Sequence, residues 1–277
     1  MLTADLHALL ARLAQGPGVL VSVAGLRGSG PREPGAWMAV FADTCIGTVG
    51  GGHLEFEAIA AARALLEQPQ PLAFTRTYAL GPTLGQCCGG STDLHFEVIS
   101  ETDGHRLRDR LGTPLQPVAL FGAGHVGSAI VQALAPLPFA LTWIDSRDAI
   151  FPEPLPLHAA AEHSDPVQSA VPQLAAGSLV LIMSFSHAED LDVLAACLKR
   201  RRERGDLPWV GLIGSRTKWA VFRQRLVARG FTEDELAGVT CPIGLPGITG
   251  KEPPVIAASV AAQLLQLRNE QKQQSDR

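Results

Sequence analysis

Hydrophobic and polar positions follow two different patterns along the chain, and the change between them divides it. In the first part, leucines recur at helical spacing over residues 2–13, which predicts an amphipathic helix. Short β-rich runs follow at 19–23, 37–41 and 46–49, then a helical run at 55–67 and a strand at 92–99. That last run alternates strictly between apolar and polar residues, which is typical of a half-buried strand in an antiparallel or mixed sheet.

The second part alternates short apolar strands with helices. The predicted strands are 118–121, 141–144, 179–183 and 210–213, and the predicted helices are 126–134, 188–204, 218–229 and 255–267. This order indicates a doubly wound parallel sheet. The predicted fold class is therefore α/β, with an N-terminal mixed-sheet α/β domain followed by a Rossmann-like doubly wound domain.

The stretch at 101–117 is polar, rich in charge and ends near a proline, so we place the domain boundary there. We expect an N-terminal domain at 1–105, a C-terminal domain at 116–268 and a polar tail at 269–277.

Composition narrows the class of protein. The net charge of −4 argues against a general affinity for nucleic acid, and no apolar run reaches the length of a membrane span. The N-terminus has no signal-peptide pattern, and five cysteines are an odd number, so we expect reduced thiols in the cytoplasm. The 28 glycines and 20 prolines show no collagen-like period, and 46% hydrophobic residues argue against disorder.

A dinucleotide fingerprint follows the first strand of the second part. Gly122, Gly124 and Gly127 form G-x-G-x-x-G between a strand and a helix, and Asp145 closes the next strand. Gly122 makes the turn, Gly124 admits a pyrophosphate and Gly127 permits close packing of helix on strand. Asp145 is a candidate acceptor for a ribose hydroxyl, while Arg147 could favour a 2′-phosphate. The turn is also compatible with a pterin pyrophosphate or with no ligand.

Two further glycine loops lie in the first part. Gly50, Gly51 and Gly52 stand directly before a helix, where successive N–H groups can face an anion. His53 follows them, and a second loop spans residues 28–35. Each loop is equally understood as a tight turn, and a solitary histidine is most often a hydrogen-bonding residue.

Adjacent cysteines, Cys87 and Cys88, stand between flexible glycines, with Gln86 before them. A disulfide between neighbours is strained, and the polar surroundings do not suit a buried pair. The pair suits a soft metal, a persulfide or a sulfur-liganded metal cofactor.

Cys241 begins another glycine-rich segment, which ends at Lys251, at the carboxyl edge expected for a sixth strand. Residues 214–218 also leave a strand for a helix and carry two basic groups suited to an anion. Cys45 and Cys197 lie in apolar patterns and are predicted to be structural.

Taken together, these motifs resemble the XdhC/CoxI family. The matching segments are residues 28–35, 50–55, 84–90, 122–127 and 241–245, in the family's order and over nearly the whole chain. The Gln86-Cys87-Cys88 form, and His53 after the triple glycine, are similar to the XdhC branch.

The resemblance implies a maturation factor for xanthine dehydrogenase rather than a free-standing enzyme. It implies binding of the molybdenum cofactor (molybdopterin), support for its sulfuration with a cysteine desulfurase, and insertion into the xanthine dehydrogenase apoenzyme. Carried over to this sequence, Cys87 and Cys88 would contact the cofactor and are the candidates for contact with its molybdenum. Cys241 is a weaker candidate for cofactor contact. The glycines at 50–52 and 122–127 would shape cofactor or nucleotide pockets.

Two other classes remain open. An NAD(P)-dependent oxidoreductase explains residues 122–145 but leaves the cysteine pair incidental. A non-catalytic scaffold between desulfurase and apoenzyme leaves both glycine sites empty. A homodimer is expected in each case.

Overall fold

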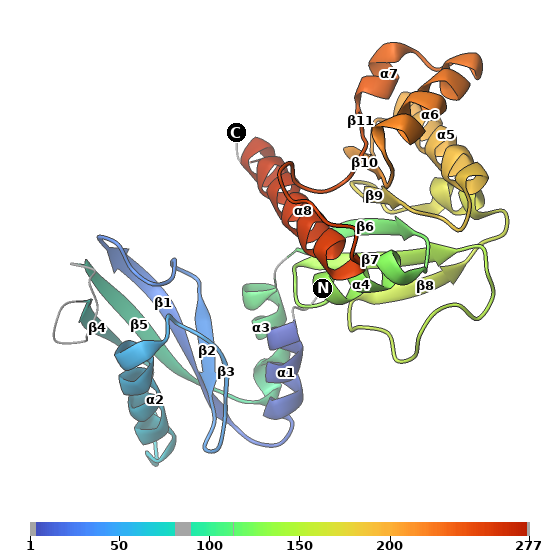
Figure 1. Cartoon of the computed structure of the whole chain (residues 1–277). Coiled ribbons are helices and arrows are strands. Elements are labelled where there is room, and N and C mark those ends of the chain that lie inside the picture. Colours follow the sequence, from blue (N-terminus) through green and yellow to red (C-terminus); the bar gives the residue numbers. More distant parts are fainter. Residues whose placement is uncertain (1–3, 81–89, 113, 276–277) are drawn as a thin grey trace. The chain divides into compact units, whose positions relative to one another are not determined.

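The structure is a computed structural model that describes residues 4–80, 90–112 and 114–275 (Figure 1). The chain divides into two compact units, residues 1–113 and 114–277. Because each unit has hydrophobic clusters of its own, each is described by itself.

The N-terminal unit is built on a five-stranded sheet with the order β3-β2-β1-β5-β4. Its strands are β1 (Gly18–Arg27), β2 (Trp37–Val40), β3 (Cys45–Gly47), β4 (Phe74–Leu80) and β5 (Gly90–Ile99). The sequence predicted all of these except β4. Every pairing between them is antiparallel, where we expected a mixed sheet.

Successive residues of β1 face two different layers of helices. Val19 and Val21 pack in the cluster that contains α2 (Gly52–Leu66), whereas Leu20 packs with α1 (Ala4–Leu13). Side chains alternate between the faces of a strand, so one strand serves both layers. The sheet is therefore covered on both faces, as Figure 1 shows.

The polar stretch that we took as a domain boundary begins with helical structure. A 3-10 turn (Glu101–Asp103) leads into α3 (Gly104–Leu111), whose Leu107 is fully buried beside residues of α1. Only one face of a short helix needs to be apolar, and in this helix Leu107 is the buried apolar side chain. Residues 101–111 thus belong to the packed N-terminal unit.

The C-terminal unit holds six parallel strands in the order β11-β10-β9-β6-β7-β8. These are β6 (Gln116–Phe121), β7 (Phe139–Asp145), β8 (Ala159–His163), β9 (Leu179–Ile182), β10 (Trp209–Leu212) and β11 (Val239–Thr240). The order is that of a Rossmann sheet, with its reversal between β6 and β9. The predicted α/β class with a doubly wound second domain is confirmed.

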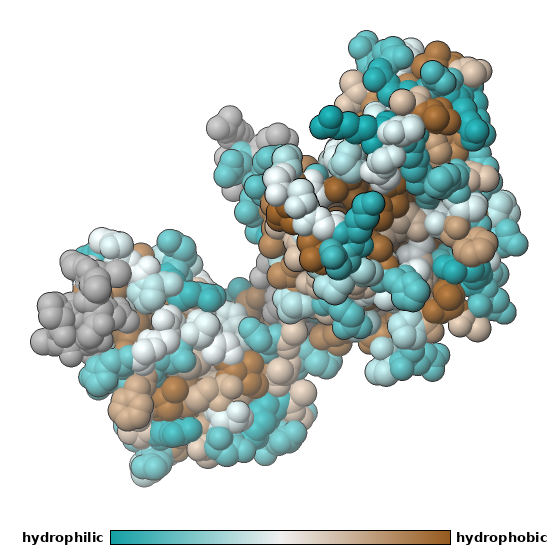
Figure 2. Space-filling view, in the orientation of Figure 1, coloured by the Kyte–Doolittle hydropathy of each residue, from teal (hydrophilic) through white to brown (hydrophobic). Residues whose placement is uncertain are grey.

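Helices cover both faces of this sheet. α4 (His125–Leu134) and α8 (Pro253–Ser275) pack on one face. α5 (His187–Arg204), α6 (Arg216–Ala228), α7 (Glu233–Ala237) and the 3-10 helix Val167–Gln173 cover the other. α8 continues to Ser275, through most of the segment predicted as a polar tail. Figure 2 shows hydrophobic residues at the surface beside α8, among more polar ones.

Candidate functional site

The fingerprint turn has the backbone geometry that its glycines predict. Gly122 has a φ of 119°, and a Cβ atom there would lie 2.0 Å from the carbonyl oxygen of Met183. A Cβ atom on Gly127 would lie 2.1 Å from the carbonyl oxygen of Gly122. Gly124 has open space around its Cβ position. The first and third glycines are therefore required by packing, and the second faces open space.

Asp145 lies at the end of β7, where a ribose-binding carboxylate would stand, but its oxygens are occupied. Oδ1 accepts from the backbone N–H and Nε of Arg147, each at 2.9 Å. Oδ2 accepts from the N–H of Ala123 at 2.6 Å and from Nη2 of Arg147 at 2.9 Å. A carboxylate has about four acceptor positions, and all of them are used within the protein.

The environment of Asp145 also sets its ionisation. Its side chain is 1% exposed, and burial alone would raise its pKa. The hydrogen bonds from Arg147 and Ala123 outweigh that effect, so the pKa lies below its ordinary value. Asp145, at the end of β7, is therefore paired with Arg147 and also accepts a hydrogen bond from Ala123 in the glycine turn.

The Gly50–Gly52 loop has a similar internal partner. Oε2 of Glu55, in the first turn of α2, accepts the N–H groups of Val49 at 3.2 Å and Gly51 at 3.1 Å. The same oxygen accepts from the hydroxyl of Thr48 at 2.5 Å. Of the three glycines, Gly51 thus donates to a carboxylate of the chain, and the N–H of Gly50 donates to the hydroxyl of Thr48 at 3.1 Å.

The glycine motifs of the N-terminal unit converge in space. A Cβ atom on Gly50 would lie 2.5 Å from Pro31, and one on Gly90 would lie 2.5 Å from the carbonyl oxygen of Arg27. The loop at 28–35 thus lies against Gly50, and its start lies against the beginning of β5.

The remaining predicted residues of this unit divide into two groups. His53 points along α2, where its Nε2 lies 3.2 Å from Glu57, and half of its side chain is exposed. Gln86, Cys87 and Cys88 lie outside the described residues, so their role stays a prediction.

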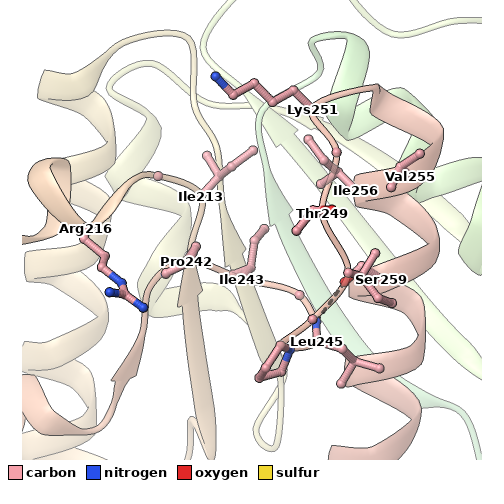
Figure 3. A pocket seen from close by; sticks show the side chains of 16 residues that line it. Ile213, Arg216, Pro242, Ile243, Leu245, Thr249, Lys251, Val255, Ile256 and Ser259 are labelled. Atoms are coloured by element: carbon pink, nitrogen blue, oxygen red, sulfur yellow. Dashed lines mark hydrogen bonds between the residues drawn. The ribbon is translucent and has the colours of Figure 1, made fainter.

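A pocket lies at the carboxyl edge of β10 and β11, with a volume of about 720 Å³ (Figure 3). Its walls are the end of β10, the start of α6, the loop from Pro242 to Lys251 and the first turns of α8. Its apolar side chains are Ile213, Pro242, Ile243, Leu245, Pro246, Ile248, Val255 and Ile256. We call it the α8 pocket.

Two consecutive residues fix one end of the pocket loop to α8. The N–H of Gly244 donates to Oε1 of Gln263 and the N–H of Leu245 to Oγ of Ser259, both at 2.8 Å. Gly244 has a φ of 99°, and its Cβ position is only 2.7 Å from the Ser259 hydroxyl oxygen. Glycine is needed there for both backbone and space.

The rest of the loop leaves donors free. Gly247 and Gly250 have φ angles of 89° and 148°. Within the described part of the chain, the N–H groups of Gly247, Thr249 and Gly250 have no hydrogen-bond acceptor. Arg216 and Lys251 enter the lining from opposite sides, as Figure 3 shows, and no carboxylate lines the pocket.

Cys241 stands just before this loop, outside the residues that line the pocket. It is half-buried near an ion pair in which Nζ of Lys218 lies 2.6 Å from Oδ2 of Asp190. Burial raises the pKa of the Cys241 thiol to about 11, against the opposing effect of Lys218. Cys241 is therefore a neutral thiol at neutral pH and a weak nucleophile.

The other described cysteines fit their predicted structural roles. Cys197 is fully buried, which raises its pKa to about 12, and burial also raises the pKa of the half-buried Cys45. Among the described residues, no three His, Cys, Asp or Glu side chains gather into a possible metal site.

Sequence reasoning missed most of the pocket. It identified Cys241 and the basic residues at 214–218, but not Ser259, Gln263 or the free donors of the loop. The available signal was three glycines between Cys241 and Lys251; the partners on α8 follow only from the packing of that helix.

The structure defines a protein with an antiparallel α/β unit and a Rossmann-type unit that carries a pocket at its carboxyl edge. Residues 118–264 match the family described as the XdhC Rossmann domain, and residues 11–79 match the XdhC and CoxI family. The chain belongs to the XdhC/CoxI family, with an XdhC Rossmann C-terminal domain. The resemblance deduced from its motifs is confirmed.

Individual relatives agree with this family. The chain is 30% identical over 257 residues to the uncharacterized protein YqeB of Escherichia coli, which covers 91% of this chain but only 44% of that protein. A crystal structure from Bacillus halodurans, described as a xanthine dehydrogenase, matches with a TM-score of 0.78 and 22% identity. It covers 97% of this chain and 96% of that one, and at this identity it shows a shared fold.

No helix among the described residues is both long and apolar enough to span a bilayer.

Proposed function

We propose that this chain is an accessory protein that binds the molybdenum cofactor, supports its sulfuration and hands it to xanthine dehydrogenase. Membership of the XdhC/CoxI family supports the link to xanthine dehydrogenase. The partners in this role are a cysteine desulfurase, the apoenzyme and a second copy of the chain, in the cytoplasm.

One structural observation carries the proposal beyond family membership. The α8 pocket, about 720 Å³ in volume, has an apolar floor, two cations and no carboxylate in its lining. Small-molecule sites are commonly about 300–1,000 Å³ and mostly apolar, with a few placed polar groups. A phosphorylated pterin fits this pocket in size and charge, with Arg216 and Lys251 as the residues that would hold it.

When bound, the cofactor supplies a molybdenum centre that can exchange an oxo for a sulfido ligand. The chain's own task is to bind and shelter this group. Cys87 and Cys88 are proposed as cofactor contacts because the family's motif carries that role to them, and they lie outside the described residues. This division describes a chaperone for the cofactor rather than a free-standing enzyme.

The oxidoreductase alternative has weaker support. A nicotinamide dinucleotide at the fingerprint would present a ribose hydroxyl to Asp145, whose acceptor positions are already filled by Arg147 and Ala123. Nucleotide binding there would require that ion pair to open.

The test is co-expression of the chain in cells that make the molybdenum cofactor, followed by measurement of co-purified molybdenum and pterin. We expect bound pterin in the wild type and a strong loss in the Cys87→Ala/Cys88→Ala double variant. Cys45→Ala serves as the matched control. A wild-type protein without pterin would refute cofactor binding, and equal loading in both proteins would remove the cysteine pair from the site.

A further inference from the structure

The Rossmann unit offers two places where an anionic ligand could bind, and they differ in the charged groups that lie beside them. One is the fingerprint turn at Gly122–Gly124, and the other is the loop at residues 247–251 in the α8 pocket. Both lie at the carboxyl edge of the same parallel sheet, where such folds bind ligands.

The fingerprint turn has an internal anion. Asp145 accepts the N–H of Ala123 at 2.6 Å, and Nε and Nη2 of Arg147 both donate to Asp145. A phosphate at this turn would come close to a buried carboxylate, and the cation beside it is already neutralised. Like charges at short range in a buried setting are strongly unfavourable.

The pocket loop shows the opposite arrangement. The N–H groups of Gly247, Thr249 and Gly250 have no acceptor in the described part of the chain, and neither Arg216 nor Lys251 has a carboxylate partner there. The nearest acid in the sequence, Glu252, accepts from the N–H of Lys251 at 2.9 Å and does not line the pocket. Unpaired N–H groups close together in a glycine-rich loop can form a concavity that suits phosphate oxygens.

These donors belong to the loop and not to the helix that follows it. α8 begins with Pro253 and Pro254, which have no N–H, and the N–H groups of Val255 and Ile256 donate to the carbonyl of Glu252. The end of the helix therefore has no free donors, and the loop supplies the site.

The apolar part of the pocket indicates what the phosphate is attached to. Ile213, Ile243 and Ile256 lie near one another in the pocket (Figure 3), and Ile248 is 50% exposed. Aliphatic side chains on this scale pack well against a flat ring, and no carboxylate is among the residues that line the pocket.

We infer that the α8 pocket is an anion site of the Rossmann unit and binds the phosphate ester of a flat heterocycle. The phosphate is held by Lys251 and the loop N–H groups, the ring lies on the isoleucines, and Arg216 neutralises charge at the other end. This inference rests on the proposed function for one point only, the identification of the heterocycle as the pterin. A free nucleotide has the same chemistry.

The experiment uses the full chain and two measurements. The first is pterin co-purified from cells that make the cofactor, and the second is binding of AMP, with adenosine as the arm without phosphate. The test variants are Arg216→Gln/Lys251→Gln, which removes the cations, and Thr249→Trp, which fills the pocket without changing charge. The control is Lys199→Gln/Arg225→Gln, which removes the same charge from exposed positions on α5 and α6.

We expect ligand retention to fall about 10- to 100-fold in both test variants, as for the loss of charged hydrogen bonds, and to stay unchanged in the control. A Gly124→Val variant, which obstructs the fingerprint, should retain the ligand. Thermal unfolding of each variant shows that it is folded.

The outcomes separate the two proposals. Pterin that is bound by the wild type and equally by both pocket variants would overturn the pocket assignment and leave the proposed function standing. No pterin, but AMP binding that the pocket variants abolish, would support the pocket and refute the proposed function. Binding of neither pterin nor AMP by the wild type would overturn both.

Discussion

The glycine loops at residues 50–52 and 244–250 look alike in the sequence but differ in what fills them. Each follows a half-buried cysteine and leads to a helix. In the first loop, Glu55 accepts the N–H groups of Val49 and Gly51, and the Cβ position of Gly50 lies 2.5 Å from Pro31. In the second, Gly244 and Leu245 are bound to side chains of α8, and the later residues line a pocket. A run of glycines therefore indicates an available anion site only when no carboxylate of the chain reaches it.

The largest expected effect is a difference in stability between substitutions at two kinds of glycine. Packing requires one kind, and the other faces open space. Gly122→Ala should destabilise the protein by about 3 kcal/mol or more, because its Cβ would meet Met183 at 2.0 Å with a φ of 119°. Gly247→Ala, with a φ of 89° but no atom within 4 Å, should cost about 1 kcal/mol. Urea unfolding followed by tryptophan fluorescence measures both, and equal costs would contradict this distinction.

The second effect concerns the stability contributed by the ion pair between Asp145 and Arg147 beside the fingerprint turn. Arg147→Met leaves Asp145 buried without its cation and should cost about 2 kcal/mol at neutral pH. The pKa of Asp145 is lowered in the folded protein, so its stabilisation is present above the unfolded value and is lost as the pH falls through the folded value.

Urea unfolding at pH 7 and at about pH 3 checks the sign of this effect. The difference between wild type and Arg147→Met should shrink on acidification. A difference that is constant with pH would mean that the arginine acts by packing rather than by charge. Arg229→Met, in a surface pair with Asp192, is the control and should change stability by about 0.5 kcal/mol or less.

The third effect converts the filled loop into an open one. Glu55→Ala removes the acceptor of Val49 and Gly51 and should cost about 2 kcal/mol. Because it frees those donors, phosphate should stabilise this variant more than the wild type in thermal unfolding. Glu57→Ala, on the exposed face of α2, should show neither change. Equal responses to phosphate in all three proteins would mean that the emptied loop does not bind anions.

The smallest expected effect concerns the reactivity of the Cys241 thiol, which precedes the second loop. Cys241, with a pKa of about 11, should react slowly with iodoacetamide at neutral pH and about tenfold faster for each unit of pH up to that value. Mass spectrometry of the alkylated peptides gives the rates. Rapid labelling of Cys241 at pH 7 would show an activated thiolate instead.

The spacing of apolar residues along the chain predicted the part of the fold in which each strand or helix has its own regular hydrophobic pattern. Four of the parallel strands and the longer helices follow from apolar strands alternating with helical runs, and these segments were placed within a few residues, whereas β8 and α7 were not predicted. The helix at Gly104–Leu111 was missed because its sequence is mostly charged and Leu107 supplies much of its buried contact. The antiparallel pairing of the N-terminal sheet was not predictable, because side-chain alternation is the same in antiparallel and mixed sheets.

The candidate site was predictable only in part, for a different reason. Glycine spacing located the turns, and the close contacts at Gly122 and Gly127 agree with their assigned tasks. Whether a turn is filled depends on the reach of a side chain such as Glu55 or Asp145 in three dimensions, which spacing does not give.

The anchoring of the pocket loop divides recognition between two kinds of wall. Gly244 and Leu245 are bound to side chains that lie one turn apart on α8, so that wall has the same shape before and after a ligand enters. Residues 247–250 have no such attachment, and their glycines permit backbone conformations closed to other residues. The first wall selects a ligand by shape, and the second can adapt its N–H groups to the anion that the ligand carries.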